Sequence, residues 1–138
     1  HLHMLVNAIS ENDERRGIDN IMTRLRSMVE ETGAGIILVS HLRRVDGNKG
    51  HENGIEVNLS HLRGSQSIAQ LSDCVLALER NQQSDDGDES RTTKVRVLKS
   101  RYTGDVGMAT HLLYDSKSGR LSEVDISDIQ VDEDEHGF

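Results

Sequence analysis

The chain has 138 residues, enough for one domain, and a formal net charge of −8 at pH 7. This acidic balance argues against a protein whose whole surface embraces nucleic acid, but it leaves room for a local basic loop. The single cysteine, Cys74, rules out a disulfide framework and suggests a reducing compartment, and no stretch approaches the ~18 apolar residues of a membrane span. No signal peptide opens the sequence, so we expect a cytoplasmic protein.

The first elements of the chain are an apolar opening and a long helix. Residues 1–9 are mostly apolar and lack a helix cap, as expected of a chain that begins inside a strand or just beyond one. Residues 13–32 are predicted to be helical, with Asn12 or Asp13 as N-cap and Gly33 as the C-terminal stop. The apolar stripe at helical spacing consists of Ile18, Ile21, Met22, Leu25, Met28 and Val29.

Beyond this helix the sequence alternates strands, loops and one short helix. The unbroken apolar run at 35–40 predicts a strand buried on both faces in a parallel sheet. The later elements are a polar loop at 43–60, a helix near 65–71, strands near 74–78, 92–100 and 109–114, an acidic loop at 82–90, and a last short strand after a turn at 116–119. Residues from about 125 onward are acidic and poor in core formers, so we expect them to be disordered.

Two cations stand at the end of the strand predicted at 92–100. Val95 and Val97 share one face of an alternating run, and Lys99 and Arg101 continue that face roughly 7 Å apart, just before a glycine-containing turn. Such a pair is suited to phosphate oxygens, with arginine offering a bidentate fork. The alternative is a solvated edge-strand pair, since lysine on an edge also blocks aggregation.

A histidine and a basic loop follow the apolar run at 35–40. His41 stands where ligands gather in open α/β sheets, and it can either hydrogen-bond a terminal phosphate or merely cap the strand end. Arg43, Arg44 and Lys49 lie on a loop loosened by glycines, which suits the phosphates of single-stranded nucleic acid. An ordinary solvated loop is the other interpretation.

Three further features attract attention. Gly64 after Arg63 permits a positive-φ backbone, and Gln70 on a short helix offers both donor and acceptor, or is a plain surface residue. Arg80 and Tyr114 each end a strand and could sandwich a nucleobase if those strands are neighbours, although a tyrosine at the edge of the core is as reasonable.

The seven histidines raise the question of a metal site. No pair has the H-x-x-x-H spacing of a helical site or a cysteine partner at ligand spacing. We therefore predict no metal ligand in this sequence.

Seven short motifs together resemble the C-terminal part of a RecA-type replicative DNA helicase domain of the DnaB-like group, in particular that of the primase–helicases of short-tailed bacteriophages. They keep the family's order over most of residues 13–114. The motifs are DERR at 13–16, IDNIMTRL at 18–25, SHL at 40–42, LRGS at 62–65, QLSD at 70–73, LALERNQQ at 76–83 and KSRYTGDVG at 99–107.

The resemblance implies the C-terminal half of an α/β, RecA-like P-loop NTPase core over residues 1–124, a mostly parallel sheet flanked by helices, followed by the acidic tail 125–138. It implies an NTP-dependent DNA helicase, a hexameric ring that couples NTP hydrolysis to translocation on single-stranded DNA and duplex unwinding during replication. No Gly-x-x-x-x-Gly-Lys-[Ser/Thr] occurs in the sequence. The P-loop and the Mg²⁺ ligands for ATP or another NTP or dNTP are thus expected upstream. Residues 1–138 alone are therefore expected to be inactive in hydrolysis. A phage-encoded protein would act in the host cytoplasm.

The resemblance also implies residue roles. His41 matches a γ-phosphate sensor, Arg101 matches an arginine finger that acts in trans beside Lys99, and Arg80 and Tyr114 match the nucleotide base pocket. The positions matching the DNA path and its coupling to the nucleotide are Arg43, Arg44, Lys49, Arg63, Gly64 and Gln70.

The tail resembles the segment with which such phage proteins dock on the replicative DNA polymerase. Its candidate partner-binding residues are Asp132, Glu133, Asp134, Glu135 and Phe138. An acidic run with one terminal aromatic combines long-range attraction to a basic surface with an anchor, whereas a solvated tail that aids solubility is the plainer interpretation.

Two other functions remain open from the residues. One is a recombinase-type RecA relative that forms filaments and exchanges strands, since the Lys99-x-Arg101 pair also occurs there. The other is a non-catalytic interaction module with the acidic tail as its working end. Arg63-Gly64 and Gln70 favour the helicase.

Overall fold

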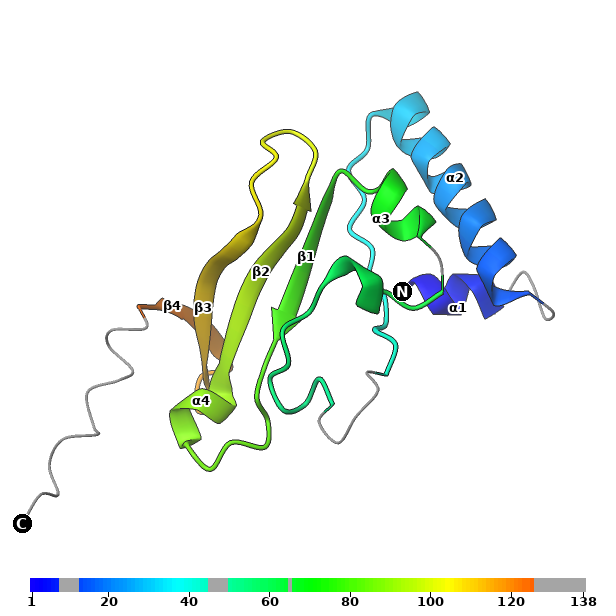
Figure 1. The fold of residues 1–138 in the computed structure, drawn as a ribbon. Coiled ribbons are helices and arrows are strands. Elements are labelled where there is room, and N and C mark those ends of the chain that lie inside the picture. Colours follow the sequence, from blue (N-terminus) through cyan, green and yellow to red (C-terminus); the bar gives the residue numbers. More distant parts are fainter. Residues whose placement is uncertain (8–12, 45–49, 65, 126–138) are drawn as a thin grey trace, which may run out of the picture. The chain divides into compact units, whose positions relative to one another are not determined.

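A computed structural model of the chain describes residues 1–7, 13–44, 50–64 and 66–125 (Figure 1). It divides into two compact units, one comprising His1–Arg44 with Asn58–Asp73 and the other Val45–Val57 with Cys74–Phe138. No helix in the described part of the chain has the length and apolarity needed to cross a membrane.

The first unit contains the helices α1 (Leu2–Asn7), α2 (Glu14–Thr32) and α3 (Ser67–Leu71) and the 3₁₀ turn η1 (Leu59–His61). α2 confirms the long helix predicted from the sequence. The Asp13 side chain accepts a hydrogen bond from the Arg16 N–H, and Gly33, at φ 69°, donates its N–H to the Val29 carbonyl. The buried core of this unit consists of Leu2, Val6, Ile18, Ile21, Met22 and Ile68.

Two predictions for the first unit were wrong. Residues 2–7 form a helix rather than a strand end, because Leu2 and Val6, four residues apart, lie on one helical face and are both buried. Residues 35–40 form neither a strand nor a helix, and Ile37 is 97% exposed. No described strand pairs with this segment, and the Val39 carbonyl instead accepts a hydrogen bond from the Leu2 N–H of α1, at 3.0 Å.

Gly64 fixes a close approach inside the first unit. Its φ of 107° is strained for any residue with a side chain, and a Cβ at this position would collide with Cδ1 of Ile18. The sequence-based expectation of a positive-φ glycine here is confirmed.

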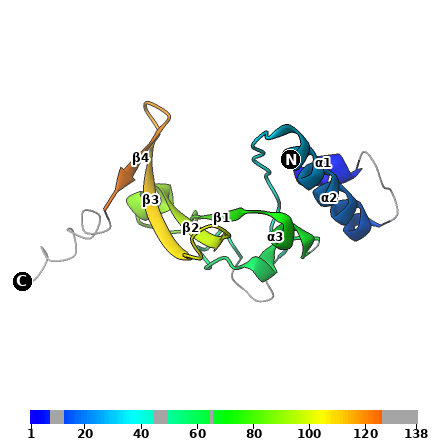
Figure 2. The ribbon, with the colours of Figure 1, turned by 90° about the horizontal axis from the view of Figure 1, so that it is seen from above.

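The second unit is built on a sheet of four strands, β1 (Cys74–Glu79), β2 (Thr92–Ser100), β3 (Gly107–Asp115) and β4 (Arg120–Val124). Figure 2 shows the strands following one another in chain order. Every pairing is antiparallel, so the mostly parallel sheet expected from the resemblance is not what the described residues form. The turns at 101–106 and 116–119 join β2 to β3 and β3 to β4, and such short connections require antiparallel strands, whereas β1 and β2 are joined by the longer segment 80–91.

The acidic segment predicted as a loop at 82–90 contains a short helix, α4 (Gly87–Arg91). The Asp86 side chain caps it by accepting hydrogen bonds from the N–H groups of Asp88 and Glu89. The strands predicted near 74–78, 92–100 and 109–114, the helix near 65–71 and the last short strand are confirmed with small shifts of their ends.

A buried ion pair joins the first two strands of the sheet. Glu79 on β1 is 3% exposed, and its Oε1 accepts hydrogen bonds from the Val57 N–H at 2.8 Å and from Nε of Arg96 on β2 at 2.9 Å. Nη2 of Arg96 also lies 3.2 Å from Oε2 of Glu56. The hydrogen bond to Glu79 is the main cause that raises the pKa of Arg96. This network ties the segment before residue 58 to β1 and β2.

Candidate functional site

The turn that follows β2 carries Arg101 and is braced by its own side chains. Arg101 is exposed directly after the strand. The Gly104 N–H donates to the Ser100 carbonyl at 3.0 Å, and the Ser100 and Thr103 hydroxyl oxygens lie 2.9 Å apart. The hydroxyl of Thr103 also accepts from the Asp105 N–H. Arg101 therefore projects from a turn with a defined backbone, as a residue that contacts a partner requires.

Lys99 does not share one strand face with Val95 and Val97, as the alternation of the sequence predicted. Lys99 is half-buried opposite Val75 of β1, whereas Leu76 pairs with Val97. Leu98 has no partner in this register, which marks a bulge. The strict alternation that put Lys99 on the face of Val95 and Val97 is interrupted there, so the same-face argument does not hold through residue 98.

His41 lies in a short backbone ladder. Its carbonyl accepts a hydrogen bond from the Arg63 N–H at 3.1 Å, and the Arg43 N–H donates to the His61 carbonyl at 2.8 Å. Between these bonds Leu42 and Leu62 form an antiparallel bridge. The histidine, the first arginine of the basic loop and the Arg63-Gly64 element were predicted separately, and the ladder brings all three together.

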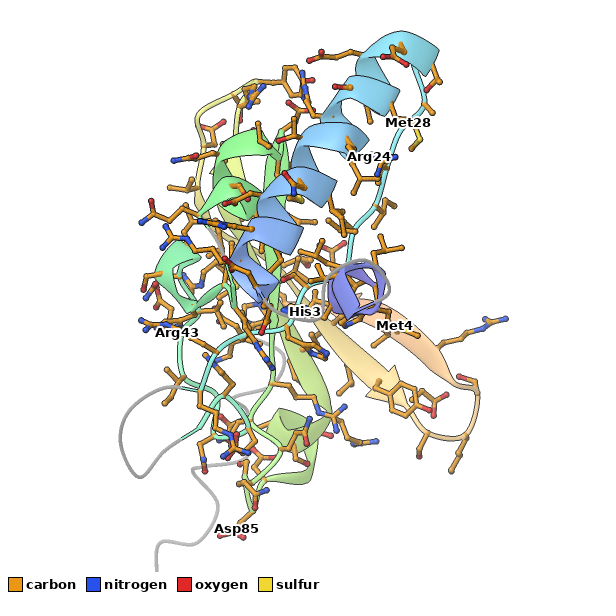
Figure 3. The ribbon with its side chains drawn as sticks, turned by 90° about the vertical axis from the view of Figure 1, so that its right-hand side faces the viewer. His3, Met4, Arg24, Met28, Arg43 and Asp85 are labelled. Atoms are coloured by element: carbon orange, nitrogen blue, oxygen red, sulfur yellow. The ribbon has the colours of Figure 1, made fainter. Side chains whose placement is uncertain are left out.

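An ion pair holds the Arg63 side chain against the start of α2. Nε and Nη2 of Arg63 lie 3.1 and 3.2 Å from Oε1 and Oε2 of Glu14. Nε2 of His3 lies 3.4 Å from the same Oε1 atom. Figure 3 shows His3, a residue of α1, near the beginning of α2. Glu14 belongs to the DERR motif, but nothing in the motif predicts its contact with Arg63, 49 residues away.

His3 is nearly buried, with 8% of its surface exposed. Burial lowers the pKa of His3; Glu14 opposes this effect, while the neighbouring His41 and Arg63 act in the same direction as burial. The imidazole of His3 is therefore held in its neutral form at neutral pH.

Three histidine rings converge in the first unit. The ring centroid of His41 lies 4.2 Å from that of His1 and 5.1 Å from that of His3. One nitrogen from each ring lies within 4.8 Å of the others. The prediction of no metal ligand rested on local spacings only and missed this cluster, in which His41 meets two histidines from the beginning of the sequence.

Most of the remaining predicted site residues are either exposed or lie outside the described part of the chain. Arg43 and Arg44 are exposed, as is Gln70 in α3. Lys49 and the tail residues Asp132, Glu133, Asp134, Glu135 and Phe138 lie outside the described residues.

Arg80 and Tyr114 do not end neighbouring strands, as their interpretation as a base sandwich assumed. Arg80 is exposed directly after β1, and Tyr114, 38% exposed, lies in β3 opposite Leu121 of β4. The strand order puts β2 between them. The two strands run in the same direction, so both residues lie toward one end of the sheet, about 10 Å apart across two strand spacings at the nearest.

Comparison with known proteins agrees with the motifs. Residues 1–123 match the model of the DnaB-like helicase C terminal domain. Over 121 residues the chain is 42% identical to the DNA helicase/primase of Enterobacteria phage T3, an alignment that covers 88% of this chain. The chain spans 21% of that relative's length. The α/β, RecA-like class predicted from the sequence is confirmed at the level of the family, and the chain belongs to the family of DnaB-like helicase C-terminal domains.

Proposed function

We propose that this chain is the part of a replicative DNA helicase in which the state of the bound nucleotide is coupled to the grip on single-stranded DNA. The observation that carries the proposal is the backbone ladder joining His41 and Arg43 to Arg63 and His61. A residue suited to a terminal phosphate and two arginines suited to DNA phosphates share one hydrogen-bonded segment. The family and the phage T3 relative support the replicative role.

Coupling follows from the stiffness of the ladder. Loss of the terminal phosphate releases the His41 ring, and any backbone shift there moves Arg43, two residues along, and Arg63, to which His41 is hydrogen-bonded. Arg63 is in turn held by Glu14, and Gly64 packs tightly on Ile18. A displacement is therefore transmitted to the DNA-contacting arginines rather than absorbed by a loose loop.

The nucleotide is held mainly by residues outside this chain in our proposal. Mg²⁺ requires oxygen ligands, whereas the side-chain group able to hold a metal in the described part of the chain is made of histidines. These residues do not fit the Mg²⁺ of an NTPase, and we assign it no step here. Arg101 and Lys99 serve the nucleotide of a neighbouring subunit in a hexameric ring. Arg80 and Tyr114 border the base without the close sandwich that neighbouring strands would have allowed.

The basic loop is expected to set the salt dependence of DNA binding. In the full-length protein, Arg43→Ala with Lys49→Ala removes two phosphate contacts, so the slope of log affinity against log salt should become shallower by about 1.4 for single-stranded DNA. The loss should be the same for every DNA sequence. Fluorescence anisotropy at several salt concentrations measures this slope.

Arg24 supplies the matched control for that experiment. It is exposed on α2, and Figure 3 labels it together with Arg43. Arg24→Ala removes one positive charge outside the loop and should leave the slope unchanged, whereas Arg43→Ala alone should make it shallower by about 0.7. An unaltered slope in the double variant would exclude the loop from the DNA path.

The tail 125–138 is proposed to recruit the replicative DNA polymerase. Its deletion, or Phe138→Ala, should weaken polymerase binding and leave DNA-stimulated hydrolysis by the full-length protein intact, because the tail carries no residue assigned to the nucleotide or the DNA. Surface plasmon resonance at low salt, where electrostatic attraction is strongest, is the appropriate measurement. Asp134→Asn should weaken binding more than Asp85→Asn, which neutralises an exposed carboxylate outside the tail. Equal polymerase affinity with and without the tail would leave it a solubilising segment.

A further inference from the structure

We propose that His1, His3 and His41 bind a divalent transition-metal ion of the zinc class, each through one ring nitrogen. The site does not depend on the proposed function, although it shares His41 with it. Three observations carry the inference: the convergence of the three nitrogens, an unsatisfied nitrogen on the buried member, and a carboxylate behind that same ring.

The three rings are already close to ligand distance. Their nitrogens lie within 4.8 Å of one another. A tetrahedral ion at 2.0–2.1 Å from each nitrogen separates its ligands by about 3.4 Å, so closure requires movements of about 1.4 Å at most. His1 and His41 are exposed and can rotate toward the buried ring. The hydrogen bond from the Leu2 N–H to the Val39 carbonyl fixes the two backbone segments that carry them.

His3 offers a ring nitrogen with nothing to bind. Its side chain is 10% exposed, and both of its ring nitrogens are buried without a hydrogen-bond partner among the described residues; Nε2 has an ion-pair contact with Glu14, which leaves Nδ1 for a metal ion. Buried polar atoms of native proteins almost always have a partner, and an orphan requires an explanation. A metal ion shared with His1 and His41 supplies the missing partner.

The other nitrogen of His3 faces a carboxylate, as in many metal centres. Nε2 lies 3.4 Å from Oε1 of Glu14, longer than a well-formed hydrogen bond but within the range of an ion-pair contact. Glu14 is itself oriented by two contacts from Arg63. A carboxylate behind a ligating imidazole fixes the ring and raises its basicity, which is the arrangement that supports histidine–metal bonds.

The donor set selects the class of metal. Imidazole nitrogens suit Zn²⁺, Cu²⁺ and Ni²⁺, whereas Mg²⁺ and Ca²⁺ prefer oxygen ligands. Three protein ligands leave a fourth position for water or an anion. A metal at this site also holds the ring of His41, which then no longer reaches a terminal phosphate.

The test is metal binding by the full-length protein and its variants. After treatment with a chelator, the protein is dialysed against Zn²⁺ and the bound metal is counted; Co²⁺ replaces Zn²⁺ as a probe of tetrahedral coordination in visible absorption. Wild type should hold one more equivalent than His41→Ala and His3→Gln. His61→Ala, which removes an imidazole of the same unit outside the cluster, should hold as much metal as wild type. Glu14→Gln should weaken binding roughly 10–100-fold.

Equal metal content in wild type, His41→Ala and His3→Gln would overturn the site. His41 is exposed, so His41→Ala decides the question even if His3→Gln fails to fold, as checked by circular dichroism. Loss on His1→Ala alone would point to an adventitious ion at a single histidine and would also overturn it.

A second measurement tests whether metal binding at the three histidines affects phosphate sensing by His41. Micromolar Zn²⁺ should inhibit DNA-stimulated hydrolysis by wild type, and the fractional inhibition should disappear in His3→Gln, which keeps His41. Binding without inhibition would support the site and overturn its link to phosphate sensing. If His41 has no part in hydrolysis, the dialysis result is unaffected, so a failure of the proposed function is distinguishable from a failure of the metal site.

Discussion

Arg101→Ala in the full-length protein is expected to lower kcat for DNA-stimulated hydrolysis by about 10³–10⁵, the range known for arginine fingers, with little change in nucleotide affinity. The residue is exposed at the start of a turn whose backbone is braced by Ser100, Thr103 and Gly104. A cation presented this way can reach the nucleotide of a neighbouring subunit and offset charge that develops only in the transition state. Steady-state hydrolysis and equilibrium binding of a labelled nucleotide measure the two quantities.

Arg120 provides the matched control for this expectation. It is an exposed arginine at the beginning of β4, in a different hairpin of the same sheet. Arg120→Ala should leave kcat within a few-fold of wild type. Mixing Arg101→Ala subunits with P-loop-deficient subunits should restore part of the activity, because each supplies what the other's interface lacks. A failure of the mixture to regain activity would assign Arg101 to its own subunit's nucleotide or to the fold.

The elements predicted correctly are those specified by neighbouring residues. Asp13 and Gly33 bound α2 through hydrogen bonds that span three or four residues, so the sequence contains both signals. The alternation at 92–100 and the turn at 116–119 likewise predict β2 and the hairpin into β4 locally. Helix α4 also has a local signal, because Asp86 is an N-cap residue followed by two acidic residues in the first turn. The segment was nevertheless predicted as a loop because it is polar throughout.

The elements predicted wrongly depend on tertiary partners. The apolar run at 35–40 indicates burial, but burial and strand formation both require a neighbouring strand, and in the described residues none pairs with it. α1 spans only Leu2–Asn7, too short for a periodicity of 3.6 to be recognised, and becomes evident only when Leu2 and Val6 pack in the core.

The candidate site likewise combines features that local sequence predicts with contacts that only the fold creates. His41 and Arg63 were identified from motifs and from the chemistry of their side chains, whereas their backbone hydrogen bond joins distant positions and leaves no local trace. The contact of Glu14 with Arg63 and the cluster of His1, His3 and His41 are of this kind as well. The spacing of histidines along one helix reveals ligands of that helix, but it does not reveal ligands that two distant segments of the chain bring together.

Glu79→Ala is expected to lower the free energy of unfolding by about 3 kcal/mol, as for other broken buried ion pairs. Its carboxylate is buried and accepts hydrogen bonds from the Val57 N–H and from Arg96, so truncation leaves both donors without their acceptor. Arg96 keeps its contact with Glu56, which limits the cost to the lower end of the range. Urea denaturation followed by circular dichroism measures the change.

The same substitution at an exposed glutamate of the sheet separates burial from loss of charge. Glu123 lies on β4, is exposed and accepts a hydrogen bond from the Thr110 hydroxyl, so Glu123→Ala should cost about 0.5 kcal/mol or less. The cost of Glu79→Gln should fall between the two, because the amide oxygen can still accept from Val57 while the charge facing Arg96 is lost.

Since Arg80 follows β1, and β2 carries Lys99 and leads into Arg101, loosening the Glu79–Arg96 pair should also lower hydrolysis by the full-length protein under conditions where it remains folded. Equal costs for Glu79→Ala and Glu123→Ala would mean that the network contributes nothing to holding β1 and β2 together.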